Sequence, residues 1–502
     1  MAYIWLGGRP LGGRILPRLS LGFFGGRALL VAVAGGALLA GHGCSSSSSP
    51  PAPKPSTDAG TPDGATGDGG AADAAPVPMK VWDWTGIVGT GQSLSVGAQG
   101  SPINLSAQPF NNLKLSLGAG VFPPFDPTST SLSMVPLTEP IRNYATVYPS
   151  AYPQNIDGET PHTAMADEIT SLYNAATGGM DYVTVHTVVG ESGQPMSVID
   201  KTAVEVDDAG TSMGRAYNAT LFEATAITRL ATAANKSYGI GGIIITHGEA
   251  DSGNTDYEKD LVQLWTDYNM DLKQITGQTQ SIPMFVSQQH STPETNVLEA
   301  STLAEWTVGL DHPNDIICSG PKYQYPYYTD GIHLVTQGYE ALGEKYAEVY
   351  YQHVVLGQAW APLQPLSTTT SVTRAGAVIT VQFHVPVEPM VWDTTLPPPH
   401  ATVPQWAMGN GFEVSTLGGA PLQINSVVID GDSVHITCAQ DLTGQALNVS
   451  YAFLTDATTT FPPVAGGTFR WGLLRDSDAF VGSTTKNTQP NFAVAFSIVS
   501  AH

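Results

Sequence analysis

The sequence predicts an α/β protein in which helices cover both faces of a parallel β-sheet, followed by an antiparallel β-sandwich. Three observations favour this arrangement. Apolar runs without alternation, such as residues 242–245, are typical of strands buried on both faces. Amphipathic segments separate these runs, and the clearest is residues 257–275, where apolar residues recur every three or four positions. After about residue 365, short runs alternate between apolar and polar residues, as in antiparallel strands.

Residues 79–365 are predicted to form one α/β domain, because strand and helix patterns alternate along this part of the chain. The expected strands are residues 84–89, 182–189, 240–246, 283–287 and 315–318. The expected helices are residues 161–174, 212–234, 256–275, 296–308 and 336–353.

Residues 366–502 are predicted to form the β-sandwich. Residues 378–385 and 447–453 alternate, and two further apolar runs flank Asp430-Gly431-Asp432-Ser433. An Asp-Gly pair between such runs is a strong signal for a β-hairpin. The residues of this second domain show no pattern that indicates catalysis.

The composition excludes some classes of protein. With 502 residues and 42% hydrophobic content, the chain has enough apolar material for large cores. Only 13% of the residues are charged, while Gly (53) and Pro (37) are frequent, as in loop-rich secreted proteins. The net charge of −23 argues against binding to a phosphate backbone, so we expect no nucleic-acid partner.

Residues 1–44 are predicted to be a signal peptide. The uncharged run at residues 28–40 follows a basic segment and is short for a membrane span. Small residues before Cys44 and five serines after it resemble a bacterial lipoprotein signal, in which the cysteine is lipidated. We therefore expect an exported lipoprotein at the outer membrane or cell surface, attached through Cys44. Because Gly41 and His42 depart from the usual residues, a periplasmic or secreted protein is the alternative.

Residues 45–78 are predicted to be a disordered linker, since nearly all of them are Ser, Pro, Ala, Gly, Asp or Thr. The two remaining cysteines, Cys318 and Cys438, fall in different predicted domains. They either form a disulfide between the domains or stay as buried thiols. No Cys-x-x-Cys or His-Glu-x-x-His spacing indicates a metal site, and we expect no cofactor.

Chemically capable residues follow the predicted strands, where α/β sheets place their active residues. The first strand is followed by Gln92 and Ser93, the second by Gly190, and the third by residues 247–251. The sequence Asp330-Gly331-Ile332-His333 precedes the last helix. Together these segments supply a hydroxyl, an imidazole, a carboxylate and two glycine-containing loops.

These four segments, in this order, resemble the conserved blocks of SGNH hydrolases, and specifically of the sialate O-acetylesterase and family-6 acetylxylan esterase branch. The matching blocks are Gly91-Gln92-Ser93, Gly190, Gly248-Glu249-Ala250-Asp251 and Asp330-Gly331-Ile332-His333. Two positions differ from that branch: Leu94 stands where Asn is common, and His247 where Gln is common.

The resemblance implies an SGNH-hydrolase-like (flavodoxin-like) three-layer α/β/α fold and a catalytic triad. Ser93 is the expected nucleophile, His333 its base and Asp330 the carboxylate that orients the imidazole. The oxyanion donors are expected to be the backbone N–H groups of Ser93 and Gly190, with the His247 ring as a third donor. Two residues are expected in supporting positions, Gln92 and Glu249.

The function implied is a carbohydrate O-acetylesterase: a carboxylic ester hydrolase that removes acetyl or similar short acyl groups through an acyl-enzyme. Its expected partner is an acylated carbohydrate. The alternative is a carbohydrate-binding surface protein that keeps the fold with a degenerate site, because Leu94 and His247 differ from the family pattern.

Other interpretations concern single residues. Ser95 and Ser192 are alternative nucleophiles. Glu249 and Asp251 are either a second acid–base pair or acceptors that brace their loop, and bracing is favoured. Aromatic residues could form a rim on which sugars stack, although such residues usually belong to the core. They are Trp82, Trp84, Tyr323, Tyr325, Tyr327 and Tyr328.

Overall fold

The computed structural model describes residues 76–116, 125–141, 158–203, 215–289, 300–400, 402–454, 456–458 and 467–500. The predicted signal peptide, Cys44 and residues 45–75 of the predicted linker lie outside the described residues. Residues 73–502 belong to one compact unit. None of the helices in the described part of the chain is long and apolar enough to cross a membrane.

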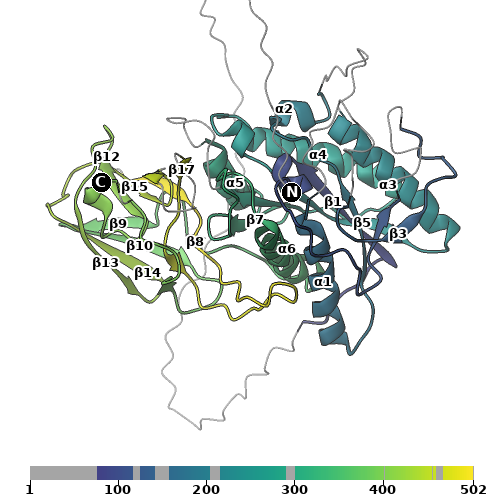
Figure 1. The fold of residues 1–502 in the computed structure, drawn as a ribbon. Coiled ribbons are helices and arrows are strands. Elements are labelled where there is room, and N and C mark those ends of the chain that lie inside the picture. Colours follow the sequence, from purple (N-terminus) through teal and green to yellow (C-terminus); the bar gives the residue numbers. More distant parts are fainter. Residues whose placement is uncertain are drawn as a thin grey trace, which may run out of the picture. The chain divides into compact units, whose positions relative to one another are not determined.

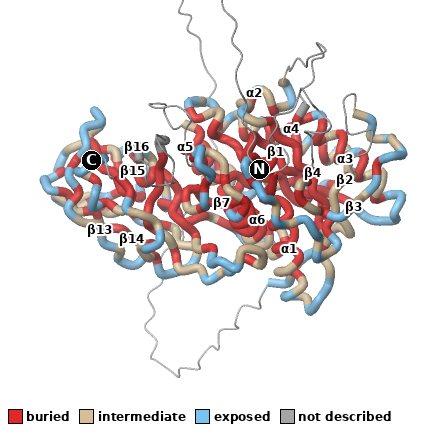
Figure 2. The backbone as a smooth tube through the Cα atoms, viewed as in Figure 1, coloured by how far each residue is buried: buried red, intermediate tan, exposed pale blue. Residues whose placement is uncertain are grey.

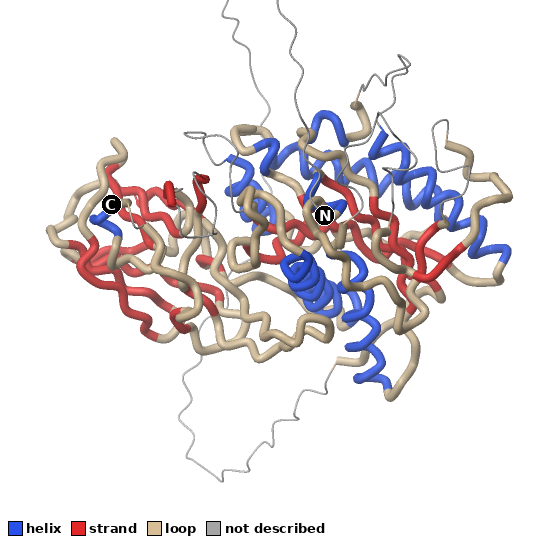
Figure 3. Tube along the Cα trace, viewed as in Figure 1, coloured by secondary structure: helices blue, strands red, loops and turns tan. Residues whose placement is uncertain are grey.

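A seven-stranded sheet lies at the centre of the α/β region (Figures 1 and 3). Its strand order is β3-β2-β4-β1-β5-β6-β7, and all neighbours are parallel except β2 and β3. The strands are β1 (Trp84–Gly91), β2 (Leu113–Leu115), β3 (Met134–Pro136), β4 (Val183–Val188), β5 (Tyr238–Thr246), β6 (Met284–Gln288) and β7 (Ile316–Pro321). The predicted sheet is confirmed. The pattern did not reveal β2 and β3, because a strand of three residues carries too little periodicity.

Helices cover both faces of this sheet. They are α1 (Pro161–Thr177), α2 (Met196–Ile199), α3 (Arg215–Ala233), α4 (Tyr257–Thr276), α5 (Ala300–Asp311) and α6 (Thr336–Tyr350). Figure 1 shows α3 and α4 on one side of the sheet and α1 and α6 on the other. The predicted three-layer architecture is therefore confirmed.

The strand residues explain the three layers. In β5, Ile243 and Ile245 pack into the apolar cluster that contains α3, α4 and α5, whereas Ile244 packs into the cluster with α1 and α6. Successive side chains of a strand point to opposite faces, so a strand that is apolar at every position needs cover on both sides. Figure 2 shows the resulting buried layer along the central strands.

The strand order places a topological switch point beside β1. From β1 the sheet continues through β4 in one direction and through β5 in the other. In open α/β sheets of this kind, ligands bind outside the carboxyl ends of the strands at the switch point. The segments that follow β1 and β5 therefore lie where such a fold forms its ligand site.

Antiparallel strands make up the C-terminal region. They are β8 (Gln364–Pro365), β9 (Val372–Ala375), β10 (Val378–His384), β11 (Val391–Trp392), β12 (Phe412–Thr416), β13 (Ile424–Asp430), β14 (Ser433–Cys438), β15 (Leu447–Tyr451), β16 (Asp456–Thr458), β17 (Gly467–Phe469), β18 (Leu474–Arg475) and β19 (Phe496–Ser500). The predicted hairpin is β13–β14, with Gly431 at φ 61° in its turn. Inward residues of the sheets containing β10 and β15 share one apolar cluster, as in a sandwich.

The C-terminal region packs directly on the α/β region. Gln288, at the end of β6, exchanges two hydrogen bonds with the backbone of Ala495, at 2.7 and 2.9 Å. The Tyr323 hydroxyl donates to the Ala493 carbonyl at 2.6 Å, and the buried Lys345 ammonium donates to the Gln489 carbonyl at 2.6 Å. The apolar cluster that contains α3 to α5 also continues into the sandwich. Removing residues 366–502 would therefore expose part of the core of the α/β region.

Cys318 and Cys438 are both buried and free, so the disulfide alternative is not realised. Burial raises the pKa of the Cys318 thiol to about 12 and that of Cys438 to about 11. Both side chains therefore act as small apolar groups.

Candidate active site

Ser93 lies directly after β1, as the first residue of a short 3₁₀ turn (Ser93–Val96). The chain enters this turn through Gly91, whose φ is 132°, and a Cβ there would lie 2.2 Å from the Thr246 carbonyl oxygen of β5. Only glycine allows β1 and β5 to approach so closely at this point. Gly97, with φ 81°, ends the turn. The Ser93 side chain is thus held at the switch point of the sheet.

His333 and Asp330 lie in the loop between β7 and α6. The Asp330 Oδ1 atom accepts the backbone N–H groups of Ile332, at 2.9 Å, and His333, at 3.0 Å. The His333 carbonyl accepts the Tyr328 N–H at 2.7 Å, so the two arms of the loop are tied together. A carboxylate that caps its own loop leaves its second oxygen in a defined position.

Ser93, His333 and Asp330 form one chain of hydrogen bonds. His333 Nδ1 lies 2.7 Å from Asp330 Oδ2, and His333 Nε2 lies 2.7 Å from Ser93 Oγ. A carboxylate only accepts, so Nδ1–H donates to it, and Nε2 is left to accept the Ser93 hydroxyl. The structure therefore brings together the three residues that the motifs suggested, with the tautomer that a serine nucleophile requires.

Asp330 is held in its charged form. Burial raises its pKa, but the hydrogen bonds from the His333 ring and from two backbone N–H groups outweigh that effect, and the pKa lies below its ordinary value. The side chain is 32% exposed and that of His333 is 16% exposed. A charged carboxylate at this place favours a proton on Nδ1 and stabilises the imidazolium when His333 takes up a second proton.

Gly190 follows β4 beside the Ser93 turn. The N–H groups of Val189 and Glu191 donate to Gly89 and Gly91, which aligns this segment with the end of β1. A Cβ on Gly190 would lie 2.1 Å from Ser95 Oγ. Among the described residues, no acceptor binds the backbone N–H of Ser93 or of Gly190. Within the described ranges, one unpaired N–H group therefore belongs to Ser93 itself and the other to the segment beside its turn.

His247 occupies a different environment from the one expected. Its ring is buried, with Nε2 3.0 Å from the Gln194 carbonyl and Nδ1 2.7 Å from the Tyr257 hydroxyl. Since a carbonyl only accepts, Nε2 carries the proton and Nδ1 accepts from Tyr257. The ring then has no N–H left for an oxyanion. These contacts join the end of β5 to the start of α4 and to the loop after β4, so the role of His247 is to stabilise the fold.

Gln92 and Glu249 connect the loops around Ser93. Gln92 Nε2 donates to Glu249 Oε2 at 3.0 Å, and Gln92 Oε1 accepts the Ala250 N–H at 3.1 Å. Glu249 Oε1 forms an ion pair of 3.0 Å with Lys322, and both side chains are buried. Burial lowers the pKa of Lys322, but Glu249 and Glu305 outweigh this and raise it, so Lys322 is charged.

Lys322 is a site residue that the sequence motifs did not reveal. Its position directly after β7 is the one sequence feature that could have indicated it. A charged residue that follows a parallel strand lies at the same edge of the sheet as Ser93. Through Glu249 and Gln92 it braces the segment that carries Ser93.

The alternative residues lie elsewhere or have other partners. The Ser95 hydroxyl donates to the Gln92 carbonyl at 2.6 Å, and His333 Nε2 is bonded to Ser93 rather than to Ser95 or Ser192. Asp251 Oδ2 accepts the Met196 N–H at 2.6 Å, which is a bracing contact.

The suggested aromatic rim is wrong for most of its members. Trp84 begins β1, and Trp82 packs on Gly239 near the start of β5, so both lie at the amino end of the sheet, opposite Ser93. Tyr323, Tyr325 and Tyr327 are buried, and only Tyr328 is largely exposed, at 39%. Aromatic side chains are more often buried in the core than exposed, and a local cluster in the sequence does not show which of them stay outside.

Side chains that could hold a metal ion do not gather in groups of three or more within the described ranges. At this edge of the sheet the structure gathers a hydroxyl, an imidazole, a carboxylate and backbone donors.

No family model and no curated protein sequence matches this chain. Solved structures with similar folds are found at low identity. A carbohydrate acetylesterase from Xanthomonas citri is 13% identical, with a TM-score of 0.48 and coverage of 82% of this chain and 80% of that one. A protein from Arabidopsis thaliana is 13% identical, with a TM-score of 0.38 and coverage of 54% and 98%. NanS is 14% identical, with a TM-score of 0.38 and coverage of 56% and 98%.

Proposed function

We propose that the protein is a serine esterase that transfers the acyl group of an ester to Ser93 and then to water. The observation that carries this proposal is the continuous chain from Ser93 Oγ through His333 to Asp330, with both distances at 2.7 Å. A serine hydroxyl is a weak nucleophile by itself, and an oriented imidazole is the group that activates it.

The reaction follows from the hydrogen bonds. As Ser93 Oγ attacks the carbonyl carbon, His333 Nε2 takes up the hydroxyl proton, and Asp330 stabilises the resulting imidazolium. The same proton passes to the leaving alcohol, which departs and leaves the acyl group on Ser93. Water then attacks the acyl-enzyme, His333 accepts its proton, and the proton returns to Ser93 Oγ as the carboxylic acid is released.

The tetrahedral intermediates carry a negative oxygen that needs donors. The proposed donors are the backbone N–H groups of Ser93 and Gly190, which have no acceptor among the described residues. Backbone donors held by a β-strand end cost no reorganisation when the charge develops. A third side-chain donor is not assigned, because the ring of His247 is bound to Tyr257 and Gln194.

We propose an acylated carbohydrate as the substrate, with acetyl or a similar short acyl group removed. The motif blocks at residues 91–93, 190, 248–251 and 330–333 support this, since they resemble those of carbohydrate O-acetylesterases. The triad by itself supports ester cleavage and does not indicate which alcohol forms the ester.

Covalent labelling tests the chemistry. A fluorophosphonate probe added to the full-length protein should label Ser93, identified by peptide mass spectrometry, and Ser93→Ala should abolish the label. The rival function, carbohydrate binding with a degenerate site, predicts no label in either protein. Release of acetate from acetylated xylan, compared with release from p-nitrophenyl acetate, then tests the substrate class.

We also propose that the protein is exported and attached to a membrane through lipidated Cys44. The basic segment, the apolar run at residues 28–40 and the serines after Cys44 support this. Incorporation of radiolabelled palmitate into the wild type and not into Cys44→Ser would establish it. Secretion of the unlabelled wild type into the medium would favour the alternative, an ordinary signal peptide.

A further inference from the structure

Tyr328 is exposed, and no other aromatic side chain in the described part of the chain is. It is 39% exposed, while the other described aromatic residues are buried or half-buried. It precedes the triad residue Asp330 by two positions. An aromatic ring left in water forgoes the free energy that its burial would contribute to folding, and exposed tyrosines are typical of surfaces that contact a ligand. The position of this ring therefore bears on substrate binding.

The backbone pairing of the loop shows which way Tyr328 points. Tyr327 and Leu334 form an antiparallel bridge, and both are buried. The next pair toward the tip of the loop is Tyr328 and His333, joined by a hydrogen bond of 2.7 Å from the Tyr328 N–H to the His333 carbonyl. Opposite residues of an antiparallel pair project to the same face, and successive residues project to opposite faces. The side chains of Tyr328 and His333 therefore share the outer face.

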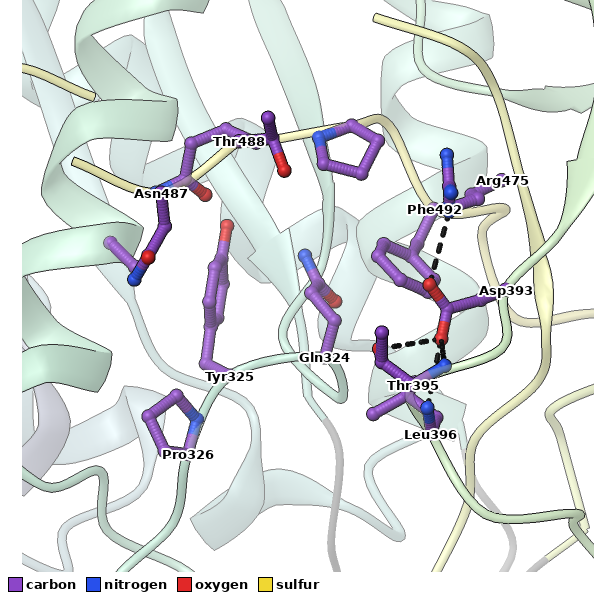
Figure 4. A pocket seen from close by; sticks show the side chains of 13 residues that line it. Gln324, Tyr325, Pro326, Asp393, Thr395, Leu396, Arg475, Asn487, Thr488 and Phe492 are labelled. Carbon is purple, nitrogen blue, oxygen red and sulfur yellow. Dashed lines mark hydrogen bonds and ion pairs between the residues drawn. The ribbon is translucent and has the colours of Figure 1, made fainter. Parts of the chain in front are cut away.

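The chain that leads to Tyr328 is held in place. The Tyr323 hydroxyl donates to the Ala493 carbonyl at 2.6 Å. The Tyr325 side chain projects toward Thr488 of the C-terminal region (Figure 4). On the other side, the Tyr328 carbonyl accepts the Gly331 N–H at 2.9 Å. The ring is thus presented from a fixed loop, and a contact made by a fixed group loses little conformational entropy on binding.

His333 marks the side of the site from which the alcohol departs. Its Nε2 atom lies 2.7 Å from Ser93 Oγ and is the atom that returns the proton to the alcohol oxygen, as the bond from that oxygen to the acyl carbon breaks. The departing oxygen therefore comes within hydrogen-bond distance of this ring. Cβ atoms of opposite residues in an antiparallel pair are about 4.5–5.5 Å apart. The rest of the alcohol is then beside Tyr328.

We propose that Tyr328 is a specificity residue for the alcohol: its ring packs against the sugar that carries the ester while His333 protonates the departing oxygen. A sugar ring has an apolar C–H face and hydroxyl groups at its edge, and tyrosine combines an apolar ring with a hydroxyl at its tip. The choice of a sugar rests on the proposed function. A short alkyl alcohol is too small to cover the ring, so two kinds of ester should respond differently to the loss of Tyr328.

The test compares Tyr328→Ala with the wild type on acetylated xylan and on ethyl acetate, with acetic acid release measured by titration at constant pH. On acetylated xylan the variant should have kcat/KM lower by about tenfold, mainly through a raised KM, because the contact is present in the bound substrate. On ethyl acetate its kcat/KM should equal that of the wild type. An unchanged kcat/KM on acetylated xylan, or an equal loss on both esters, would overturn the inference.

Two further variants separate the ring from the loop. Tyr328→Phe keeps the ring and should restore kcat/KM on acetylated xylan to within about twofold of the wild type. The bonds that hold the loop here use the backbone N–H and carbonyl of Tyr328, so they remain in both variants. Met270→Ala, at a 55% exposed position of α4, is the control and should act like the wild type. A Tyr328→Phe variant as impaired as Tyr328→Ala would contradict packing on the ring.

The wild type on ethyl acetate separates this inference from the proposed function. Cleavage of ethyl acetate without cleavage of acetylated xylan would overturn the sugar contact and leave the esterase standing. Cleavage of neither ester would refute the esterase and, with it, the role of Tyr328. Cleavage of both, with the loss in Tyr328→Ala confined to acetylated xylan, would establish the residue as the one that recognises the sugar.

Discussion

Two histidines lie at the carboxyl end of the same sheet, His333 in the loop between β7 and α6 and His247 directly after β5. Both rings have a partner at each nitrogen. His333 lies between a carboxylate and a serine hydroxyl and is partly exposed. His247 lies between a carbonyl and a tyrosine hydroxyl and is buried.

The partners decide what each ring can do. The carboxylate beside His333 stabilises the charged ring, so a proton can be taken from Ser93 and returned. The ring of His247 is hydrogen-bonded to a carbonyl and a phenol, and the nearest carboxylate oxygen, on Asp251, lies 3.9 Å from Nδ1. Burial lowers the pKa of His247 and outweighs the opposing effects of Asp251 and of the Gln194 carbonyl, so this ring stays neutral. Position at the edge of a sheet is therefore not sufficient for catalysis.

The largest expected loss of kcat follows substitution of His333 or of Ser93, its hydrogen-bond partner. Ser93→Ala and His333→Ala should each lower kcat on p-nitrophenyl acetate by about 10³–10⁶, and the double variant should be scarcely worse because the pair acts as a unit. Steady-state kinetics measures this, with circular dichroism to show that each variant is folded. A folded Ser93→Ala with normal turnover would end the assignment.

The second largest loss of kcat is expected when the Asp330 carboxylate is removed. Asp330→Asn leaves the shape of the loop but removes the charge that favours the productive tautomer, and should lower kcat by up to about 10⁴. The matched control is Asp181→Asn, on the loop before β4, which should leave kcat unchanged. Equal activity in Asp330→Asn and the wild type would show that His333 is oriented by its backbone alone.

Gly190→Ala should lower kcat by about 10²–10³, because the new Cβ would lie 2.1 Å from Ser95 Oγ and displace the proposed backbone donor. Gly418→Ala, where the nearest atom to a Cβ is 3.7 Å away, is the control. The rates should be expressed per serine titrated with a fluorophosphonate. Normal turnover per titrated serine in Gly190→Ala would remove this residue from the oxyanion site.

The smallest effect on catalysis is expected at His247. His247→Ala should keep kcat per titrated serine and lose about 1–3 kcal/mol of folding free energy, because it leaves a cavity and frees the buried Tyr257 hydroxyl. Urea unfolding measures the stability. A loss of kcat by about 10² or more in folded protein would instead return His247 to the oxyanion site.

The difference in stability between the wild type and His247→Gln should depend on pH. The folded pKa of His247 is lowered, so below about pH 6.5 the unfolded chain binds a proton that the folded ring does not, and stability falls as the pH falls. His247→Gln lacks this contribution. The gap between the melting temperatures of the wild type and His247→Gln should therefore narrow between about pH 7 and pH 5. A gap that widens would mean that the folded ring takes up the proton.

Some of the site was readable in the sequence because its signals are local. Ser93 follows a strand through a glycine, and Asp330 lies three residues before His333, so a short loop suffices to join the carboxylate and the ring. Lys322 was not found, since its role depends on Glu249 in another loop. The packing of residues 489–495 on Lys345 and Gln288 was not found either, because it joins positions more than 140 residues apart.

The sequence by itself determined the α/β class, the order of the four blocks and the hairpin at Asp430-Gly431, because periodicity and turn chemistry act between neighbours in the chain. Only the tertiary structure decided that Ser93 and not Ser95 meets His333, that both nitrogens of His247 are occupied, and that the sandwich completes the core of the α/β region. These outcomes depend on which atoms meet across the fold, and hydrogen bonding and burial are set by such non-local contacts.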